Sequence, residues 1–141
     1  MPTPTVSVYW NERRGHYLVE KYAPSPRGGS VALVEPILVD SENFDQLIAG
    51  IILACFEAYK NDGFDENQIL RESDKEHREF AQKHKKIILS LSSPTQIVIH
   101  PMMRYRGGEH LPVKGSKKTI DMVSALNELP HVIREAFSMA V

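Results

Sequence analysis

The sequence has little of what marks a secreted or membrane-bound protein. It contains a single cysteine, Cys55, so no disulfide can form within the chain. Its longest apolar stretch falls far short of the ~20 residues that a membrane-spanning helix needs. The first residues, Met-Pro-Thr-Pro-Thr, have neither the basic nor the apolar region of a signal peptide. We therefore expect a soluble, cytoplasmic protein that is not associated with a membrane.

An excess of charge of one sign is also lacking. Lys and Arg total 17 against 18 Asp and Glu, which gives a net charge of -1. This balance removes the broad positive field on which binding to nucleic-acid phosphates depends. Aromatic residues make up only 8% and do not alternate with basic ones, so a stacking platform for single strands is not expected either. We predict no nucleic-acid partner.

Familiar catalytic and metal-binding motifs do not occur. The chain has no Gly-x-Ser-x-Gly elbow, Walker loop, dinucleotide fingerprint or Cys-x-x-Cys pair. Cys55 lies in the apolar run 51–56, where a thiol behaves as a small buried hydrophobe. His77 and His84 are seven positions apart, wider than the spacing of a helical zinc pair. We predict no catalytic residue, no metal and no cofactor, and hence a protein that is not an enzyme.

What the sequence does contain is typical of one globular domain. Its 141 residues are 42% hydrophobic and 25% charged, enough to bury about two thirds of the unfolded surface in one core. Short β-branched and aromatic stretches, bounded by glycine and proline, alternate with longer amphipathic ones. We predict a single α+β domain over residues 1–141, with a mostly antiparallel sheet whose strands span residues 5–10, 16–22, 31–39, 87–91, 96–100, 110–113 and 119–123.

Three helices are expected. Apolar residues recur at three- and four-residue intervals from Phe44 to Tyr59, which predicts the principal core helix. Ser73 and Glu76 form a capping box that opens a charged helix running to about Lys85. A terminal helix is predicted after a cap at Ser124 or Asn127, with Pro130 tolerated in its first turn because no helical partner is lost there.

The chain also shows signs of an internal repeat. A shift of 79 positions places Leu18-Val19 on Ile97-Val98 and Arg27-Gly28-Gly29 on Arg106-Gly107-Gly108, whereas Leu47 matches Leu129 at a shift of 82. This pattern predicts two halves, about 5–60 and 87–140, each a hairpin followed by a helix. The charged helix, at about 64–86, would be inserted between them. Chance similarity of two glycine-rich hairpins is the alternative.

Two features are candidate binding sites. Residues 62–79 hold seven acidic residues against three basic ones, a stretch that could receive a basic protein or simply form a solvated helix face. The Arg-Gly-Gly loops at Arg27 and Arg106 could hold an anion, although tight turns are the more usual reason for such glycines. The acidic candidates are Asp62, Asp65, Glu66, Glu72, Asp74, Glu76 and Glu79.

The order of these parts resembles the small immunity proteins of bacterial contact-dependent growth inhibition systems. The resemblance rests on the following segments: Tyr17-Leu18-Val19, the Arg27-Gly28-Gly29 loop, the apolar helix from Phe44, Ile97-Val98-Ile99-His100-Pro101, the second glycine pair, and the closing helix from Leu129 to Ala136-Phe137.

This resemblance implies an antitoxin that binds and neutralises the C-terminal nuclease domain of a cognate toxin, in a 1:1 complex. It implies contact through a pocket or by strand addition at a sheet edge. The acidic residues above, together with Arg27 and Arg106, would then be the contact candidates. The alternatives are a small enzyme or ligand-binding domain for an anionic metabolite, and a self-associating scaffold subunit.

Overall fold

The predicted antiparallel α+β fold is confirmed by the computed structural model. It describes residues 3–61, 66–70, 74–104 and 110–141, with only the backbone of Glu66, Asp74 and His77. The strands are β1 (Thr5–Asn11), β2 (His16–Pro24), β3 (Ser30–Ala32), β4 (Ile37–Asp40), β5 (Lys85–Ser93), β6 (Gln96–Arg104), β7 (His110–Pro112) and β8 (Lys118–Asp121). The helices are α1 (Phe44–Asn61), α2 (Asp74–Lys83) and α3 (Ala125–Met139), with short 3₁₀ helices η1 (Glu66–Gln68) and η2 (Met122–Ser124).

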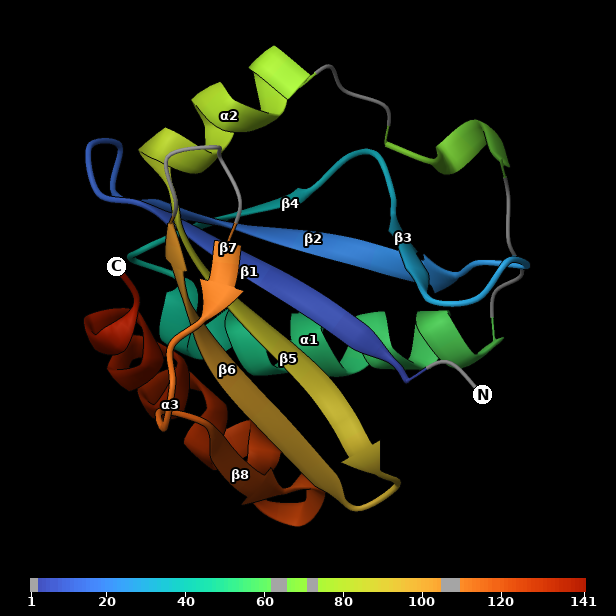
Figure 1. Ribbon diagram of the computed structural model, residues 1–141. Helices are drawn as coiled ribbons and strands as arrows, with labels where there is room; N and C mark the ends of the chain where they lie inside the picture. The colour runs from blue at the N-terminus through green and yellow to red at the C-terminus, as the bar shows by residue number, and fades with distance from the viewer. Residues whose placement is uncertain (1–2, 62–65, 71–73, 105–109) are drawn as a thin grey trace.

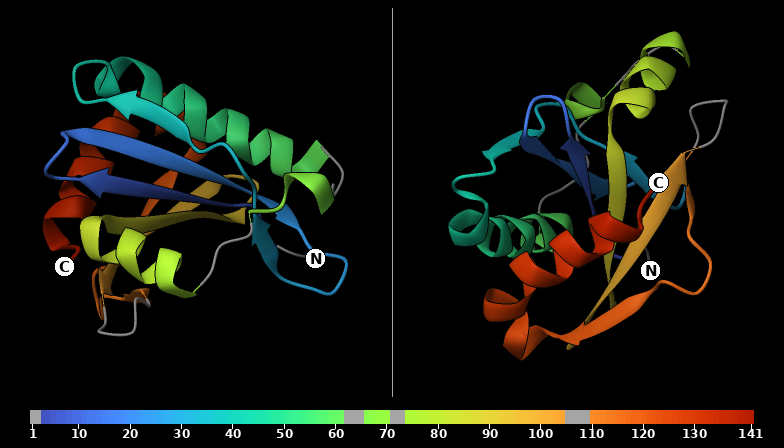
Figure 2. Two further views of the ribbon diagram at one scale, coloured as in Figure 1. Left: turned by 90° about the horizontal axis from the view of Figure 1, so that it is seen from above. Right: turned by 90° about the vertical axis from the view of Figure 1, so that its left-hand side faces the viewer.

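The strands form one antiparallel sheet in the order β3-β2-β1-β5-β6-β7, in which β4 also pairs with β2 and β8 with β6. The central strands β1 and β5 bring Val8 beside Ile87 and Val6 beside Leu89. Helices α1 and α3 lie side by side on one face of the sheet, and α2 lies on the opposite side (Figures 1 and 2). No helix in the described part of the chain is long and apolar enough to cross a membrane.

The core lies between the sheet and the pair α1 and α3. Strand periodicity places Val6 and Val8 of β1 on this face with Val19 of β2, and all three are fully buried. The apolar stripe of α1 meets them through four large side chains that are also fully buried: Phe44, Ile48, Ile52 and Phe56. Burial of one such side chain contributes about 1.5–3 kcal/mol, so this face supplies most of the driving force for folding.

Helix α3 completes this layer. Leu129 and Ile133 are fully buried against the sheet, and the Arg134 guanidinium pairs with the Asp45 carboxylate at the start of α1. Arg134 also lies 5.2 Å from the centroid of the Phe44 ring. The two helices are therefore fixed to one another as well as to the sheet.

The predicted strand over residues 31–39 is interrupted next to Pro36, a residue that within a strand indicates an edge position or a bulge. The chain forms β3, leaves the sheet and returns as β4, because Glu35 adopts a left-handed φ of 63° just before Pro36. Between the two strands, Leu33 makes a β-bridge with Ile69, and the Val34 amide donates to the Gln68 carbonyl at 2.7 Å. The segment after α1 is thereby tied to the sheet edge.

Strand β6 continues past the predicted end at His100. The carbonyl of Pro101 accepts a hydrogen bond from the Val113 amide at 2.9 Å, on the side away from β5. In antiparallel strands the N–H and C=O of a residue point to the same side. The missing proline donor therefore costs the β5–β6 ladder nothing, and the strand runs on to Arg104.

The predicted ends of the two later helices also need correction. Helix α3 begins at Ala125, so Asn127 and Pro130 lie inside it, and Pro130 is beyond the first turn. Ser124 precedes the helix but makes no side-chain cap bond, because its backbone is already helical where η2 runs into α3. Helix α2 ends at Lys83 rather than Lys85, and its predicted cap, Ser73, lies outside the described residues.

The order of elements is the same on both sides of α2. A strand pair is followed by two short strands that both pair with the second strand, and then by a core helix. The shift of 79 does not match this arrangement, because Val19 belongs to the core whereas Val98 alternates with the core residues Ile97 and Ile99. A shift by one residue turns every side chain to the other face. The internal repeat stays a prediction.

Candidate functional site

We call the sheet face opposite α1 and α3 the outer face. Its centre is a hydrogen-bonded network on β1 and β2. Tyr9 Oη and Tyr22 Oη both donate to Oε1 of Glu20, at 3.2 and 2.9 Å. Because the Tyr22 proton is used there, the Ser7 hydroxyl donates to Tyr22 Oη at 2.7 Å. One carboxylate thus orders three hydroxyl groups on neighbouring strands.

A lysine lies next to this network. Lys86 of β5 places Nζ 5.3 Å from the centroid of the Tyr9 ring. Burial lowers the pKa of Lys86, and the nearby Glu20 carboxylate partly offsets that shift. Burial and the same carboxylate raise the pKa of Tyr22. These groups line a cavity of about 350 Å³ together with Ala32, Pro36, Leu70 and Phe80.

Helix α2 meets the outer face through aromatic side chains. Phe80 packs edge-on against Tyr9, with 4.8 Å between ring centroids, and stacks on His84 at 3.9 Å. Ala81, which follows Phe80, is also buried, so this side of α2 faces the sheet. The remaining described side chains of α2 are exposed. Helix α2 therefore covers part of the outer face while presenting its charges to solvent.

The tautomer of His84 follows from its partners. Its Nδ1–H donates to the Phe80 carbonyl at 2.8 Å, which leaves Nε2 as an acceptor for Nδ2 of Asn11 at 3.5 Å. The Asn11 amide cannot easily turn around, because its Oδ1 already accepts from the Arg14 amide at 3.2 Å. Burial lowers the pKa of His84, with further lowering from the nearby His16, Lys83 and Arg14, and the hydrogen bond to the Phe80 carbonyl partly offsets this shift. The structure thus favours the neutral imidazole.

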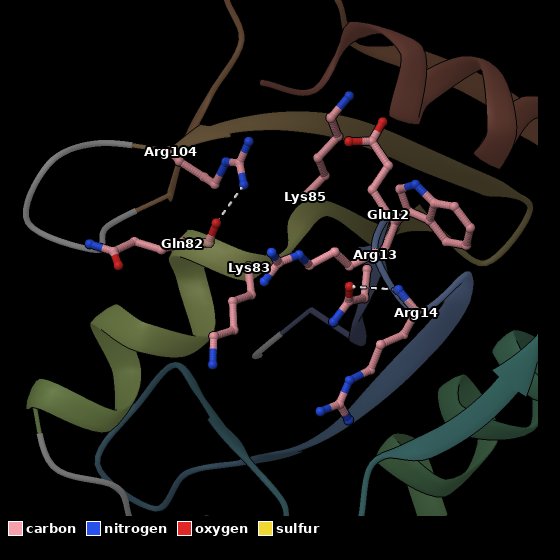
Figure 3. Close-up of a pocket in the computed structure, with 9 residues that line it drawn as sticks. Glu12, Arg13, Arg14, Gln82, Lys83, Lys85 and Arg104 are labelled. Atoms are coloured by element: carbon pink, nitrogen blue, oxygen red, sulfur yellow. Dashed lines mark hydrogen bonds between the residues drawn. The ribbon is translucent and has the colours of Figure 1, made fainter.

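A second cavity, of about 400 Å³, opens at the end of α2 and is strongly basic. Figure 3 shows Arg13 and Arg14 on the β1–β2 turn, Lys83 at the end of α2, Lys85 at the start of β5 and Arg104 at the end of β6. We call these five residues the basic cluster. Trp10, Asn11, Glu12 and Gln82 complete the lining, so five cations face a single carboxylate.

Of the candidate residues predicted from the sequence, those with described side chains, Glu76, Glu79 and Arg27, do not lie together. Glu76 and Glu79 lie on α2, beside a cavity that they share with His16 at the start of β2. Arg27 is exposed in the β2–β3 turn, at the other end of this nine-residue strand, and is thus about 30 Å away. Outside the described residues are Asp62, Asp65, Glu72 and Arg106, and the side chains of Glu66 and Asp74.

The sequence analysis missed the residues that line both cavities. Period-two spacing could have found the outer network, because Ser7 and Tyr9 alternate with Val6 and Val8, and Glu20 and Tyr22 with Val19 and Lys21. No local pattern could have found the basic cluster, since pairing of distant strands brings its members together. Burial raises the pKa of Cys55 to about 11, which keeps this thiol protonated. Among the described residues no group of histidine, cysteine, aspartate and glutamate could hold a metal ion.

Comparison with known proteins identifies the fold. No family model matches the sequence, and no curated protein sequence does. A protein of unknown function from Neisseria meningitidis superposes with a TM-score of 0.73 at 9% identity, over 99% of this chain and 96% of that one. A chain of the CdiA-CT/CdiI toxin and immunity complex from Yersinia pseudotuberculosis superposes with a TM-score of 0.68 at 13% identity, over 99% and 98%. The chain thus shares the fold of a toxin–immunity complex component.

Proposed function

We propose that this chain is an immunity protein that binds the C-terminal nuclease domain of a cognate contact-dependent growth inhibition toxin and neutralises it in a 1:1 complex. The observation that carries the proposal is the shared fold with a chain of the toxin and immunity complex, over nearly the full length of both chains. The sequence resemblance to immunity proteins favours the inhibitor over the toxin. In this role the protein acts by occupying a surface and needs no turnover.

The outer face is the proposed docking surface. The cavity of about 350 Å³, lined by tyrosines, lies on this face, and the basic cavity of about 400 Å³ lies at the end of the sheet beside α2. Glu76 and Glu79 of α2 add negative charge in a third cavity, which Arg14 and Lys83 also line. A surface with hollows, aromatic rings and both signs of charge supports specific recognition of another folded protein.

Strand addition at a sheet edge is the alternative docking mode. The edges are formed by β3 and β4 on one side and by β7 and β8 on the other, and each of these strands has only three or four residues. Short edge strands offer few free backbone groups. Leu38 on β4 and Leu111 on β7 are exposed and would extend such contacts. This mode would place the toxin at the rim of the sheet rather than beside α2.

A co-expression experiment tests the proposal. The toxin domain encoded next to this gene would be induced in bacteria with and without the chain, and growth and nucleic-acid integrity would be followed. We expect the chain to restore growth and to co-purify with the toxin domain at 1:1 stoichiometry. Growth arrest in the presence of soluble, folded chain would contradict the proposal, as would turnover of a small substrate without binding to that domain.

A further inference from the structure

The basic cluster gathers more positive charge than the chain itself offsets at this cavity. Within the described residues, Arg13, Arg14, Lys83 and Lys85 take part in no ion pair. Glu12 is the one carboxylate in the lining. Cations gathered around a hollow repel one another, and entry of an anion relieves that repulsion. The cluster is thus better suited to hold an anion than to remain empty.

Only part of the cluster is explained by the fold. Arg104 Nη1 donates to the Gln82 carbonyl at 3.0 Å, and its Nε donates to the Val141 carbonyl at 3.2 Å. This arginine therefore satisfies the end of α2 and holds the chain terminus, as cations at helix C-termini commonly do. No such partner holds the side chains of Arg13, Arg14 and Lys85. No hydrogen bond or ion pair among the described residues explains why these three side chains, from the β1–β2 turn and β5, line one cavity.

Neighbouring charges indicate which kind of anion fits. Helix α2 carries Glu76 and Glu79 one to two turns before Lys83, and both groups border the adjoining cavity of about 370 Å³. A nucleic-acid strand crossing this surface would meet these carboxylates with its own negative charges. A protein segment can match acids to the cluster and bases to α2, and it can pack apolar groups against Trp10, which lines the cavity.

We propose that the basic cluster is a receptor site for carboxylate side chains of an acidic segment of the protein partner, which is the toxin domain if the proposed function holds. The side chains of Arg13, Arg14 and Lys85 would bind the carboxylates, and Arg104, already held by backbone carbonyls, would fix the wall of the site. This inference gives the partner surface a defined chemistry: acidic groups at the cluster, beside basic groups that face Glu76 and Glu79.

The single tryptophan makes the site directly observable, because Trp10 lines this cavity and no other tryptophan contributes to the emission. Hexaglutamate would be titrated into the full chain at low salt while Trp10 fluorescence is followed. We expect a saturable change that weakens steeply as salt rises. The double variant Arg13→Glu/Lys85→Glu should bind at least tenfold more weakly. The matched variant Lys114→Glu/Lys117→Glu, which alters charge equally on the exposed loop after β7, should bind within twofold of the parent chain.

Three outcomes would overturn the inference. The first is equal loss in both double variants, which would mean that only overall charge matters. The second is tighter binding of a single-stranded oligonucleotide than of hexaglutamate, which would assign the cluster to nucleic acid. The third is tighter binding of inorganic pyrophosphate, which would assign it to a small phosphorylated ligand. Thermal unfolding of each variant would be measured alongside, so that loss of folding is not read as loss of binding.

The toxin domain separates this inference from the proposed function. If the parent chain protects cells and Arg13→Glu/Lys85→Glu protects equally well, the proposed function stands and the receptor site for the toxin fails. If the parent chain does not protect cells but the cluster still binds hexaglutamate selectively, the proposed function fails and the acidic-segment site remains. If the parent chain protects cells and Arg13→Glu/Lys85→Glu does not, the result supports both the proposed function and the receptor site.

Discussion

The two faces of the sheet differ in what they bury and in what they expose. The inner face packs Val6, Val8 and Val19 against α1 and α3. On the outer face, the alternating positions of the same strands carry Ser7, Tyr9 and Glu20. One set of strands thus carries two kinds of contact, because period-two alternation separates the apolar residues of the core from the hydrogen-bonded residues of the outer network. The predictions below test this division, from the largest expected effect to the smallest.

The largest effect is expected on the inner face. Phe44→Ala removes a fully buried ring that stacks on Tyr17 with 4.1 Å between centroids. Loss of its packing and the resulting cavity should lower the free energy of unfolding by about 3–5 kcal/mol. Chemical denaturation would measure this. Leu47→Ala, on the same helix but 48% exposed, is the control and should cost well under ~1 kcal/mol. Equal losses would contradict the assigned core.

A smaller effect is expected in the outer network. Tyr22→Phe removes the hydroxyl that joins Ser7, which is fully buried, to Glu20. Leaving the Ser7 hydroxyl without its partner should cost about 1–3 kcal/mol of unfolding free energy. Tyr59→Phe makes the same change where the partner, Ser30, is exposed and can bond to water instead. If Tyr59→Phe costs as much as Tyr22→Phe, the outer network is not a buried one.

Acid should destabilise the outer face through His84. Since burial lowers the pKa of His84 in the folded state, the unfolded chain takes up a proton first as pH falls below the ordinary value of 6.5. This contribution to stability is therefore complete above about pH 6.5 and is lost as pH falls toward the folded-state pKa. The nearby Arg14, His16 and Lys83 act in the same direction as burial, whereas the hydrogen bond to the Phe80 carbonyl opposes it.

Denaturation at pH 7.5 and at pH 5.5 would measure this loss. We expect the parent chain to lose more stability between the two conditions than His84→Gln, in which residue 84 no longer titrates. An equal or larger loss in His84→Gln would show that other groups govern the acid response. His131→Gln provides a control, because His131 is exposed and lies 3.3 Å from Glu135 at the surface of α3.

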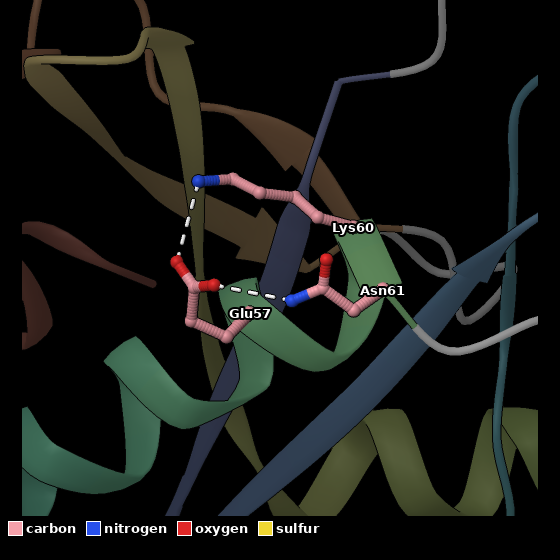
Figure 4. A network of polar contacts seen from close by, with 3 residues as sticks. All are labelled: Glu57, Lys60 and Asn61. Carbon is pink, nitrogen blue, oxygen red and sulfur yellow. Dashed lines mark hydrogen bonds and ion pairs between the residues drawn. The ribbon is translucent and has the colours of Figure 1, made fainter.

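The smallest effect is expected for a polar network at the end of α1. Oε1 of Glu57 pairs with Lys60 Nζ at 3.4 Å, and its Oε2 accepts a hydrogen bond from Asn61 Nδ2 at 3.2 Å (Figure 4). Water screens these groups, since both Glu57 and Lys60 are exposed. Glu57→Gln should change the free energy of unfolding by about 0.2–0.5 kcal/mol. A decrease in the free energy of unfolding above ~1 kcal/mol would contradict this expectation and would show that water does not screen the network.

The inner face was the part that sequence reasoning could predict. Spacing of Phe44, Ile48 and Ile52 in one helix, and alternation along β5, are local patterns that burial imposes directly. The missed break at Glu35 and the continuation of β6 through Pro101 depend on tertiary hydrogen bonds, which no local pattern contains. The start of α3 was mispredicted for a local reason, because the 3₁₀ turn η2 runs directly into the helix and leaves Ser124 without a cap bond.

The outer face was predicted poorly for a related reason. The basic cluster draws on the β1–β2 turn, α2, β5 and β6, so it exists only once the sheet has formed. The sequence instead indicated the acidic stretch over residues 62–79. Of its seven acidic residues only Glu76 and Glu79 have described side chains, and both are exposed on α2. A run of like charges in the sequence need not form a cluster in the folded protein, and binding of a charged partner depends on the cluster.

The docking surface is tested most directly by amide hydrogen exchange of the chain alone and in complex with the toxin domain encoded beside it. We predict new protection in the β1–β2 turn (residues 11–16), in α2 and at the start of β5, with no new protection on the exposed sides of α1 and α3. Protection centred instead on the exposed sides of α1 and α3, with α2 unchanged, would contradict the assignment of the outer face as the surface that meets the toxin.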